Sequence, residues 1–177
     1  MTKQFIQKSV YLLFISSLLF SCRNTKMINE KNYMVSGKVT TTNLYCGGAA
    51  PTKEMLERLK KPIPYLNKIF YVKNISDNYS EEKIILNFQS DSLGNFRFQL
   101  QPGSYAIFLE EQINKPKMSD YKNLELNQSC YQEWQNKPYK TLEIKESNTE
   151  NLSFRINRKC FIPMDNPCLS YTGPLPQ

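Results

Sequence analysis

The stretch DSLGNFRFQL, Asp91 to Leu100, combines a turn with a strict alternation of apolar and polar residues. Phe96, Phe98 and Leu100 fall on one face of an extended chain, because successive side chains of a strand point to opposite sides. Gly94 stands where a tight hairpin needs a positive φ angle. The stretch therefore predicts a strand that is entered from a tight turn and buries one face in an antiparallel sheet.

Six other segments show the same alternation or form short β-branched and aromatic runs. They are residues 34–41, 68–73, 83–89, 104–109, 141–144 and 152–156. One helix is predicted over residues 52–60, with Glu54 and Arg58 spaced for an ion pair, and a second over residues 128–135. Seven strands that do not alternate with helices predict a mainly β fold, an antiparallel β-sandwich.

The 177 residues suffice for one domain with a core, since 40% of them are hydrophobic. The chain has no histidine, which excludes Ser-His-Asp and Cys-His catalysis and every histidine-containing zinc or copper site. Glu110 with Glu111, or Asp120 with Glu125, could supply a pair of carboxylates for a glycosidase, but nothing in the sequence fixes two of them at a useful separation. We therefore expect no catalytic residues, no metal and no cofactor.

Residues 1–21 are predicted to be an export signal, because a basic start precedes a short apolar run over residues 10–20. The next residues, Leu19-Phe20-Ser21-Cys22, resemble the lipobox of bacterial lipoproteins. The resemblance implies cleavage before Cys22 and acylation of Cys22 by chains such as palmitate. It also implies anchoring in the outer membrane, on the periplasmic face or at the cell surface. Residues 22–32 would then form a polar tether. The alternative is a plain signal peptide, with Cys22 near the cleavage point by chance.

Four cysteines remain in the exported part of the chain: Cys46, Cys130, Cys160 and Cys168. An even number of cysteines in an oxidising compartment favours two disulfides, with three pairings open. A zinc site of four cysteines is the first alternative, although the chain has no CxxC pair, and free buried thiols are the second.

The net charge of +7 is spread along the chain, and no basic run exceeds two residues. A nucleic-acid interface needs a concentrated basic face, so we expect no nucleic-acid partner.

Three segments resemble the carboxypeptidase regulatory-like family. They are Val35-Ser36-Gly37-Lys38-Val39, Asp91 to Phe96, and Leu100 to Tyr105, which are similar in order to the family's G-x-V strand, D-x-x-G-x-F turn and L-x-P-G-x-Y hairpin. The resemblance implies a transthyretin-like (prealbumin-like) Greek-key β-sandwich of seven strands with one short helix. It would cover residues 33–177, with a long loop insertion at residues 110–140 and a disulfide-held tail at residues 158–177.

Residues 45–51 and 166–176 are in addition similar to a group of Bacteroidetes envelope lipoproteins. In a transthyretin-like fold the first and last strands lie parallel and end at the same pole. All four cysteines would then gather there, at the end opposite the turn at residues 91–95. We expect any binding to take place at this cysteine-rich pole.

The candidate binding residues at the pole are Gly47, Gly48, Trp134 and Tyr171. The two glycines could form a backbone nest for an anion, or only let the chain turn beside a disulfide. Trp134 and the tyrosines could form an aromatic surface, or only cover the core. We thus expect the chain to be a structural module or one that binds an envelope protein or glycan. Its lipid would also anchor it to the membrane. The alternative is a small-ligand carrier whose mouth is the pole.

Overall fold

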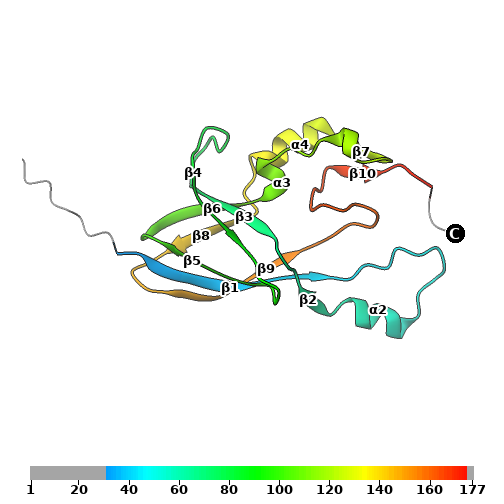
Figure 1. Ribbon diagram of the computed structural model, residues 1–177, viewed down its shortest axis with the longest axis horizontal. Coiled ribbons are helices and arrows are strands. Elements are labelled where there is room, and N and C mark those ends of the chain that lie inside the picture. The colour runs from blue at the N-terminus through cyan, green and yellow to red at the C-terminus, as the bar shows by residue number, and fades with distance from the viewer. Residues whose placement is uncertain (1–30, 175–177) are drawn as a thin grey trace, which may run out of the picture. The chain divides into compact units, whose positions relative to one another are not determined.

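Figure 1 shows the computed structural model of the protein, which describes residues 31–174. Residues 1–30, with the predicted signal peptide and Cys22, lie outside the described residues. The strands are β1 (Tyr33–Thr42), β2 (Pro62–Pro64), β3 (Ile69–Asn74), β4 (Ile84–Gln89), β5 (Asn95–Leu100), β6 (Gly103–Leu109), β7 (Leu124–Leu126), β8 (Lys140–Ile144), β9 (Thr149–Ile156) and β10 (Leu169–Tyr171). The helices are α2 (Lys53–Leu59), α3 (Glu110–Ile113) and α4 (Gln128–Gln135), with a 3₁₀ turn at Met118–Asp120.

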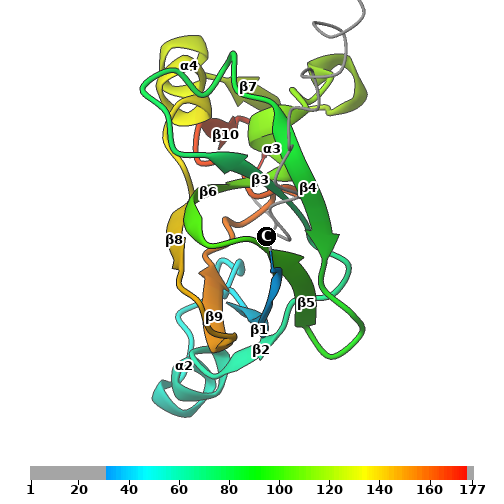
Figure 2. The same cartoon turned by 90° about the vertical axis from the view of Figure 1, so that its left-hand side faces the viewer.

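The fold is mainly β, and two four-stranded sheets form its body. In the first sheet β1 pairs antiparallel with β5 and β2 and parallel with β9. The second sheet has the order β4-β3-β6-β8, with all neighbours antiparallel. Figure 2 shows β9, β1 and β5 on one side of the core and β3, β6 and β4 on the other. A third, two-stranded sheet pairs β10 with β7.

All seven strands predicted from the sequence are present, and β5 follows the turn within the stretch from Asp91 to Leu100. The alternation of apolar and polar residues predicts the strands correctly because the inward side chains of the two sheets make up one core. Phe96, Phe98 and Leu100 are buried, and the ring of Phe88 stacks on that of Phe98 with centroids 4.4 Å apart. The short strands β2, β7 and β10 were not predicted, since three residues cannot display an alternation.

The two predicted helices are also present. Thr52 caps α2, since its hydroxyl accepts the backbone N–H of Met55 at 3.2 Å. The ion pair of α2 joins Glu57 and Lys60 at 2.9 Å, in place of the expected pair between Glu54 and Arg58. Helix α4 has the predicted bounds. The region between β6 and β8 is therefore more than a long loop with the predicted helix, because it also holds α3 and β7. None of the helices between residues 31 and 174 combines the length and the hydropathy needed to span a bilayer.

The parallel pairing of the first and last long strands is confirmed, with Val39 opposite Phe154 and Thr41 opposite Ile156. Both strands thus end at the same pole, from which the chain continues to Cys46 and to Cys160. The expected position of the turn at residues 91–95 is wrong. Strand β5 runs antiparallel to β1, so Asn95 pairs with Lys38 near the end of β1, and the Val39 N–H donates to the Gly94 carbonyl at 2.7 Å. The turn therefore lies at the same end as the cysteines.

Candidate functional site: the cysteine-rich pole

The first disulfide joins Cys46 to Cys160, with a Cα–Cα distance of 5.5 Å across a sequence separation of 114 residues. The parallel pairing of β1 and β9 brings the two segments together, because each cysteine follows the end of one of these strands by four residues. The bridge fastens the loop after β1 to the segment after β9.

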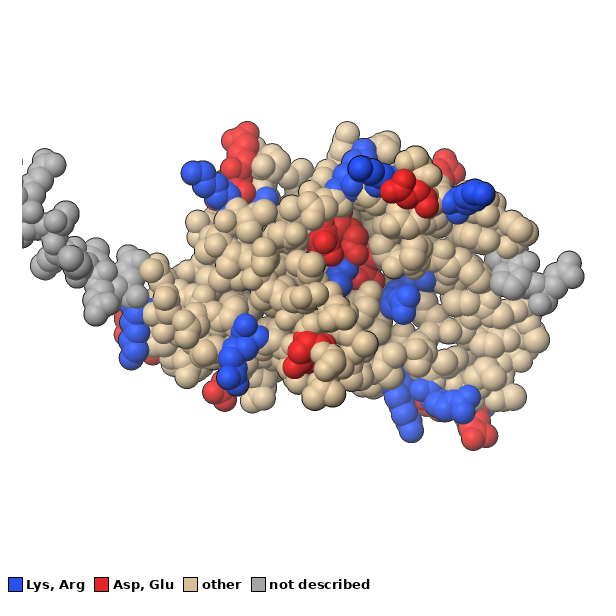
Figure 3. Space-filling model, viewed as in Figure 1, with Lys and Arg blue, Asp and Glu red and all other residues tan. Residues whose placement is uncertain are grey.

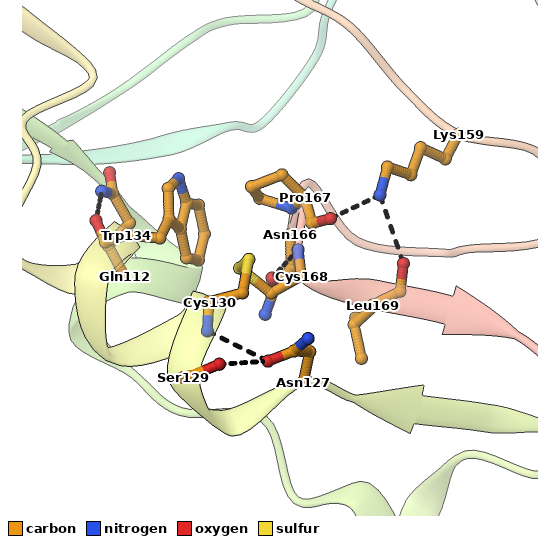
Figure 4. The surroundings of a disulfide bond; sticks show 10 residues. All are labelled: Gln112, Asn127, Ser129, Cys130, Trp134, Lys159, Asn166, Pro167, Cys168 and Leu169. Atoms are coloured by element: carbon orange, nitrogen blue, oxygen red, sulfur yellow. Dashed lines mark hydrogen bonds between the residues drawn. A yellow bond between two sulfur atoms is a disulfide. The ribbon is translucent and has the colours of Figure 1, made fainter.

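The second disulfide joins Cys130 in α4 to Cys168 just before β10 (Figure 4). Asn127 caps α4 by accepting the backbone N–H of Cys130 at 3.1 Å, and Asn166 accepts the backbone N–H of Cys168 at 2.9 Å. The pairing of β10 with β7 begins one residue beyond Cys168, with Leu169 opposite Leu126. The C-terminal segment is thus held covalently and by a strand ladder to the region between β6 and β8. Since all four sulfur atoms are used in the two bridges, the zinc and free-thiol alternatives are excluded.

Trp134 lies one turn after Cys130 on α4, and Figure 4 shows both side chains on the side of the helix that faces Pro167. The indole is partly buried, packs against the main core and lies 5.9 Å from the ring of Tyr131. Gln112 fixes this part of α4, because its amide nitrogen donates to the carbonyls of Trp134 at 2.7 Å and Lys137 at 2.8 Å. This arrangement agrees with Trp134 covering the core.

The two glycines do not have the geometry of an anion nest. A nest alternates right-handed and left-handed backbone conformations, and neither Gly47 nor Gly48 has a positive φ. Gly47 lies against the ring of Tyr45, whose hydroxyl donates to the carbonyl of Ala49. These contacts fit a loop that turns beside the Cys46–Cys160 bridge.

The pole is hollowed by an open cleft of about 640 Å³. Three segments line it: the loop after β1, the residues between the 3₁₀ turn and β7, and the segment after β9. Its walls carry cationic and aromatic side chains, namely those of Tyr121, Lys122, Arg158, Lys159 and Phe161. The cleft thus lies where three distant parts of the chain meet, two of which the Cys46–Cys160 bridge joins.

Cys46 and Cys160 line this cleft, whereas Gly47, Gly48, Trp134 and Tyr171 do not. Tyr171 instead packs on Phe161, with ring centroids 5.0 Å apart, and its hydroxyl donates to the carbonyl of Pro174. No sequence motif identifies the cleft residues Arg158, Lys122 and Phe161 as candidate site residues. Only their positions next to cysteines or at a strand end could have pointed to the pole.

A buried cluster of ions lies at the same end of the sandwich. The Lys68 ammonium contacts Oε1 of Glu111 at 2.5 Å and Oδ2 of Asp165 at 2.7 Å. The Tyr65 hydroxyl donates to the same Asp165 oxygen at 2.8 Å. Burial, together with the charge of Asp165 and this hydrogen bond, raises the pKa of the Tyr65 phenol well above its ordinary value. Glu111 thus pairs with a lysine and not with Glu110 as a catalytic pair, and in the described range no three His, Cys, Asp or Glu side chains are grouped as metal ligands.

Charged side chains of both signs are interspersed on the face of the molecule shown in Figure 3. Arg158 lies 6.0 Å from the centre of the Tyr65 ring, and Lys159 donates to the carbonyls of Pro167 and Leu169. Part of the positive charge near the pole is therefore engaged in holding the C-terminal segment.

No known family model and no curated protein sequence matches the chain. Among solved structures, a DUF3823 family protein from Parabacteroides merdae is 16% identical over 72% of this chain and 46% of that protein, with a TM-score of 0.35. The minor pilin GBS52 of Streptococcus agalactiae is 10% identical over 75% of this chain and 48% of the pilin, with a TM-score of 0.34. The N-terminal domain of the shaft pilin spaA from Lactobacillus rhamnosus GG is 8% identical over 71% of this chain and 92% of the domain, with a TM-score of 0.35. The chain spans less than half the length of the first two proteins. The fold assignment rests on the strand pairings above.

Proposed function

We propose that this protein is a non-catalytic module of the bacterial envelope that binds an envelope protein or glycan in the cleft of its cysteine-rich pole. The observation that carries the proposal is the construction of the cleft from three distant parts of the chain: the Cys46–Cys160 bridge joins two of its walls, and the pairing of β7 with β10, next to the Cys130–Cys168 bridge, holds the third. A preorganised surface loses less conformational entropy on binding, so a fixed cleft is suited to recognition.

The lining of the cleft favours a polar or macromolecular partner over an apolar ligand. Lys122, Arg158 and Asp120 lie in its walls, and the indole of Trp134 packs on the core instead of opening a cavity. The small-ligand carrier therefore remains the second candidate. It is supported only by the presence of Phe161 and Tyr121 in the same walls.

The proposal includes the lipid anchor at Cys22 and a transthyretin-like relationship. The parallel pairing of β1 and β9 supports that relationship, because it places the first and last long strands side by side in one sheet. The lipobox-like Leu19-Phe20-Ser21-Cys22 supports the anchor. Metabolic labelling with palmitate should mark the wild-type protein and not the Cys22→Ser variant, which should also leave the membrane fraction. An unlabelled wild-type protein would contradict the anchor without affecting the cleft.

Site-specific photo-crosslinking tests binding at the cleft. A benzophenone amino acid in place of Tyr121, in the wall of the cleft, should capture one discrete partner in intact cells. The same amino acid in place of Ser147 is the control, since this exposed residue follows β8 at the opposite end of the sandwich. Excess unlabelled protein should compete the Tyr121 product away.

Two outcomes would contradict the binding proposal: no product from either position, or equal products from both. A small molecule that native mass spectrometry finds on the purified protein, and that the Phe161→Ala variant loses, would support the carrier instead.

A further inference from the structure

The buried ion cluster brings together the atoms of an amide bond that has not been formed. The Lys68 ammonium has three contacts, with Oε1 and Oε2 of Glu111 at 2.5 and 2.7 Å and with Oδ2 of Asp165 at 2.7 Å. Lys68 immediately precedes β3, Glu111 is in α3 and Asp165 is in the C-terminal segment. Three distant parts of the chain thus meet at one nitrogen atom.

The position of Lys68 is fixed by its backbone as well as by its ammonium group. Its N–H donates to the hydroxyl of Ser90 at 2.9 Å, and its carbonyl accepts the N–H of Ser90 at 3.0 Å. Ser90 is itself buried. The backbone N–H of Asp165 lies 3.4 Å from Oε1 of Glu111, and the carboxylates of both residues contact the same ammonium nitrogen of Lys68. Reactive groups that are held at contact distance in this way react at a high effective concentration.

The cluster is an expensive arrangement of charges. Lys68 is 6% exposed and Asp165 is 7% exposed, so both ions have lost nearly all of their hydration. One ammonium faces two carboxylates, and Oδ1 of Asp165 is buried with no hydrogen-bond partner among the described residues. Converting Lys68 and Asp165 into a neutral amide would remove both buried charges and leave only the charge of Glu111, whose side chain is 15% exposed. A water-excluded site therefore favours the amide over the ion pair, and it also protects the amide from hydrolysis.

We propose that the side chains of Lys68 and Asp165 become joined by an intramolecular amide bond, with Glu111 as the carrier of protons. The ammonium first passes a proton through Glu111 to the Asp165 carboxylate, which leaves a neutral amine beside a carboxylic acid. The amine nitrogen attacks Cγ of Asp165, and the new C–N bond forms. A second proton then passes from this nitrogen through Glu111 to the departing hydroxyl, the C–O bond breaks, and one water molecule leaves.

The atoms and charges of this step balance without any other reactant. One ammonium and one carboxylate become one amide and one water, and Glu111 ends as the carboxylate that it was at the start. Tyr65 supports the step because its hydroxyl donates to Oδ2 of Asp165, the oxygen on which negative charge develops when the amine attacks. Oδ1, which has no partner, is then the departing oxygen. Glu111 acts as a proton-transfer residue of this self-modification, and Tyr65 stabilises the developing charge.

Peptide mapping of the reduced full-length protein tests the proposal. Trypsin does not cleave after an acylated lysine, so the amide should appear as one branched peptide that joins residues 61–73 to residues 160–177. Its mass should be lower than the sum of the two linear peptides by one water. The reduced chain should also migrate faster on a denaturing gel than a chain without the amide.

Two variants separate chemistry from folding. Lys68→Arg keeps the cation and its ion pairs but has no amine nucleophile, so it should fold and lose the branched peptide completely. Glu111→Gln keeps the shape of the proton carrier and should also lose it. Linear peptides 61–68 and 160–177 from folded wild-type protein would overturn the proposal, even if both variants failed to fold.

Two further outcomes would overturn parts of the assignment. A branched peptide that is lighter by one ammonia would place the bond at Asn166, whose side chain is buried next to Asp165. An undiminished branched peptide in Glu111→Gln would remove the role of Glu111.

Discussion

Gly37 of β1 faces the backbone of Leu152 in β9 so closely that a Cβ atom on Gly37 would lie 2.1 Å from the Leu152 carbonyl oxygen. The ring of Phe96 lies on the same side, 2.7 Å from the same Cβ position. The register of the parallel pair shifts between Val35 and Gly37, at the point of closest approach. The contact of the first and last long strands, which defines the pole, therefore depends on the absence of a side chain at residue 37.

Replacing Gly37 by alanine should lower the free energy of unfolding by about 3 kcal/mol, because the new methyl group collides with backbone that cannot rotate away. Urea denaturation measures the loss. Gly48→Ala is the matched control, since Gly48 is exposed and has no positive φ. Equal stabilities of the two variants would show that β1 and β9 can separate at little cost.

The two disulfides should contribute unequally to stability. In the chain-entropy model, the Cys46–Cys160 bridge with its separation of 114 residues contributes about 4.8 kcal/mol, and the Cys130–Cys168 bridge with its separation of 38 residues contributes about 3.9 kcal/mol. Replacing both cysteines of one bridge by serine should thus lower Tm more for the first bridge than for the second. Calorimetry of the two double variants checks the order, and the reverse order would show that the pole is fixed mainly through α4.

Stability should fall at alkaline pH. The folded protein keeps the proton of Tyr65, whose pKa is raised mainly by burial, whereas the unfolded chain releases it at about pH 10. The stabilisation is complete below pH 10 and is lost as the pH rises through the raised value, by up to about 1.4 kcal/mol per pH unit. Burial also raises the pKa of Tyr131 and Tyr139, so these two residues add to the loss of stability at alkaline pH.

Urea denaturation of the wild type and of Tyr65→Phe between about pH 8 and about pH 12 isolates the contribution of Tyr65. This range extends below and above the ordinary tyrosine pKa of about 10. The variant should lose less stability per pH unit than the wild type. Parallel curves would show that the phenol of Tyr65 ionises freely in the folded state.

Gln112 should be the most important polar side chain for holding α4 on the sandwich. It is 2% exposed, accepts the N–H of Leu109 at 2.9 Å and donates to two carbonyls of the α4 region. Gln112→Ala leaves these groups buried without partners and should cost about 3 kcal/mol. Hydrogen exchange should accelerate in residues 128–137 more than in β1. Gln132→Ala, at an exposed position of the same helix, should change neither measurement.

The body of the sandwich could be predicted from the sequence because its signal is local. Each long strand alternates apolar and polar residues along its own length, so Phe96 and Phe98 report their orientation without any knowledge of their partners. The two predicted helices also depend on local interactions, since Thr52 and Asn127 cap them from adjacent positions. The three-residue strands carry no such periodic signal, and only their tertiary partners create them.

The site could be predicted only in outline. The resemblance to a transthyretin-like fold, with its parallel first and last strands, predicted that the cysteines gather at one pole. The disulfide pairing could be assigned only from the three-dimensional positions of all four cysteines. Lys68 looked like an ordinary polar residue at a strand end, and its burial depends on Glu111 and Asp165 from distant segments. The predicted position of the turn at Gly94 was wrong because β5 runs antiparallel to β1. Its first residue, Asn95, therefore lies toward the end of β1 from which the chain continues to Cys46.

The Cys46–Cys160 bridge has a mechanical consequence. A pull applied at Tyr33 and at Thr172 follows the shortest covalent route, which crosses the bridge between the two sulfur atoms. Residues 47–159 therefore carry no tension while the bridge is closed, and only the short segments on either side of it can be drawn out. Reduction of this single bond would transfer the load to the sheets themselves.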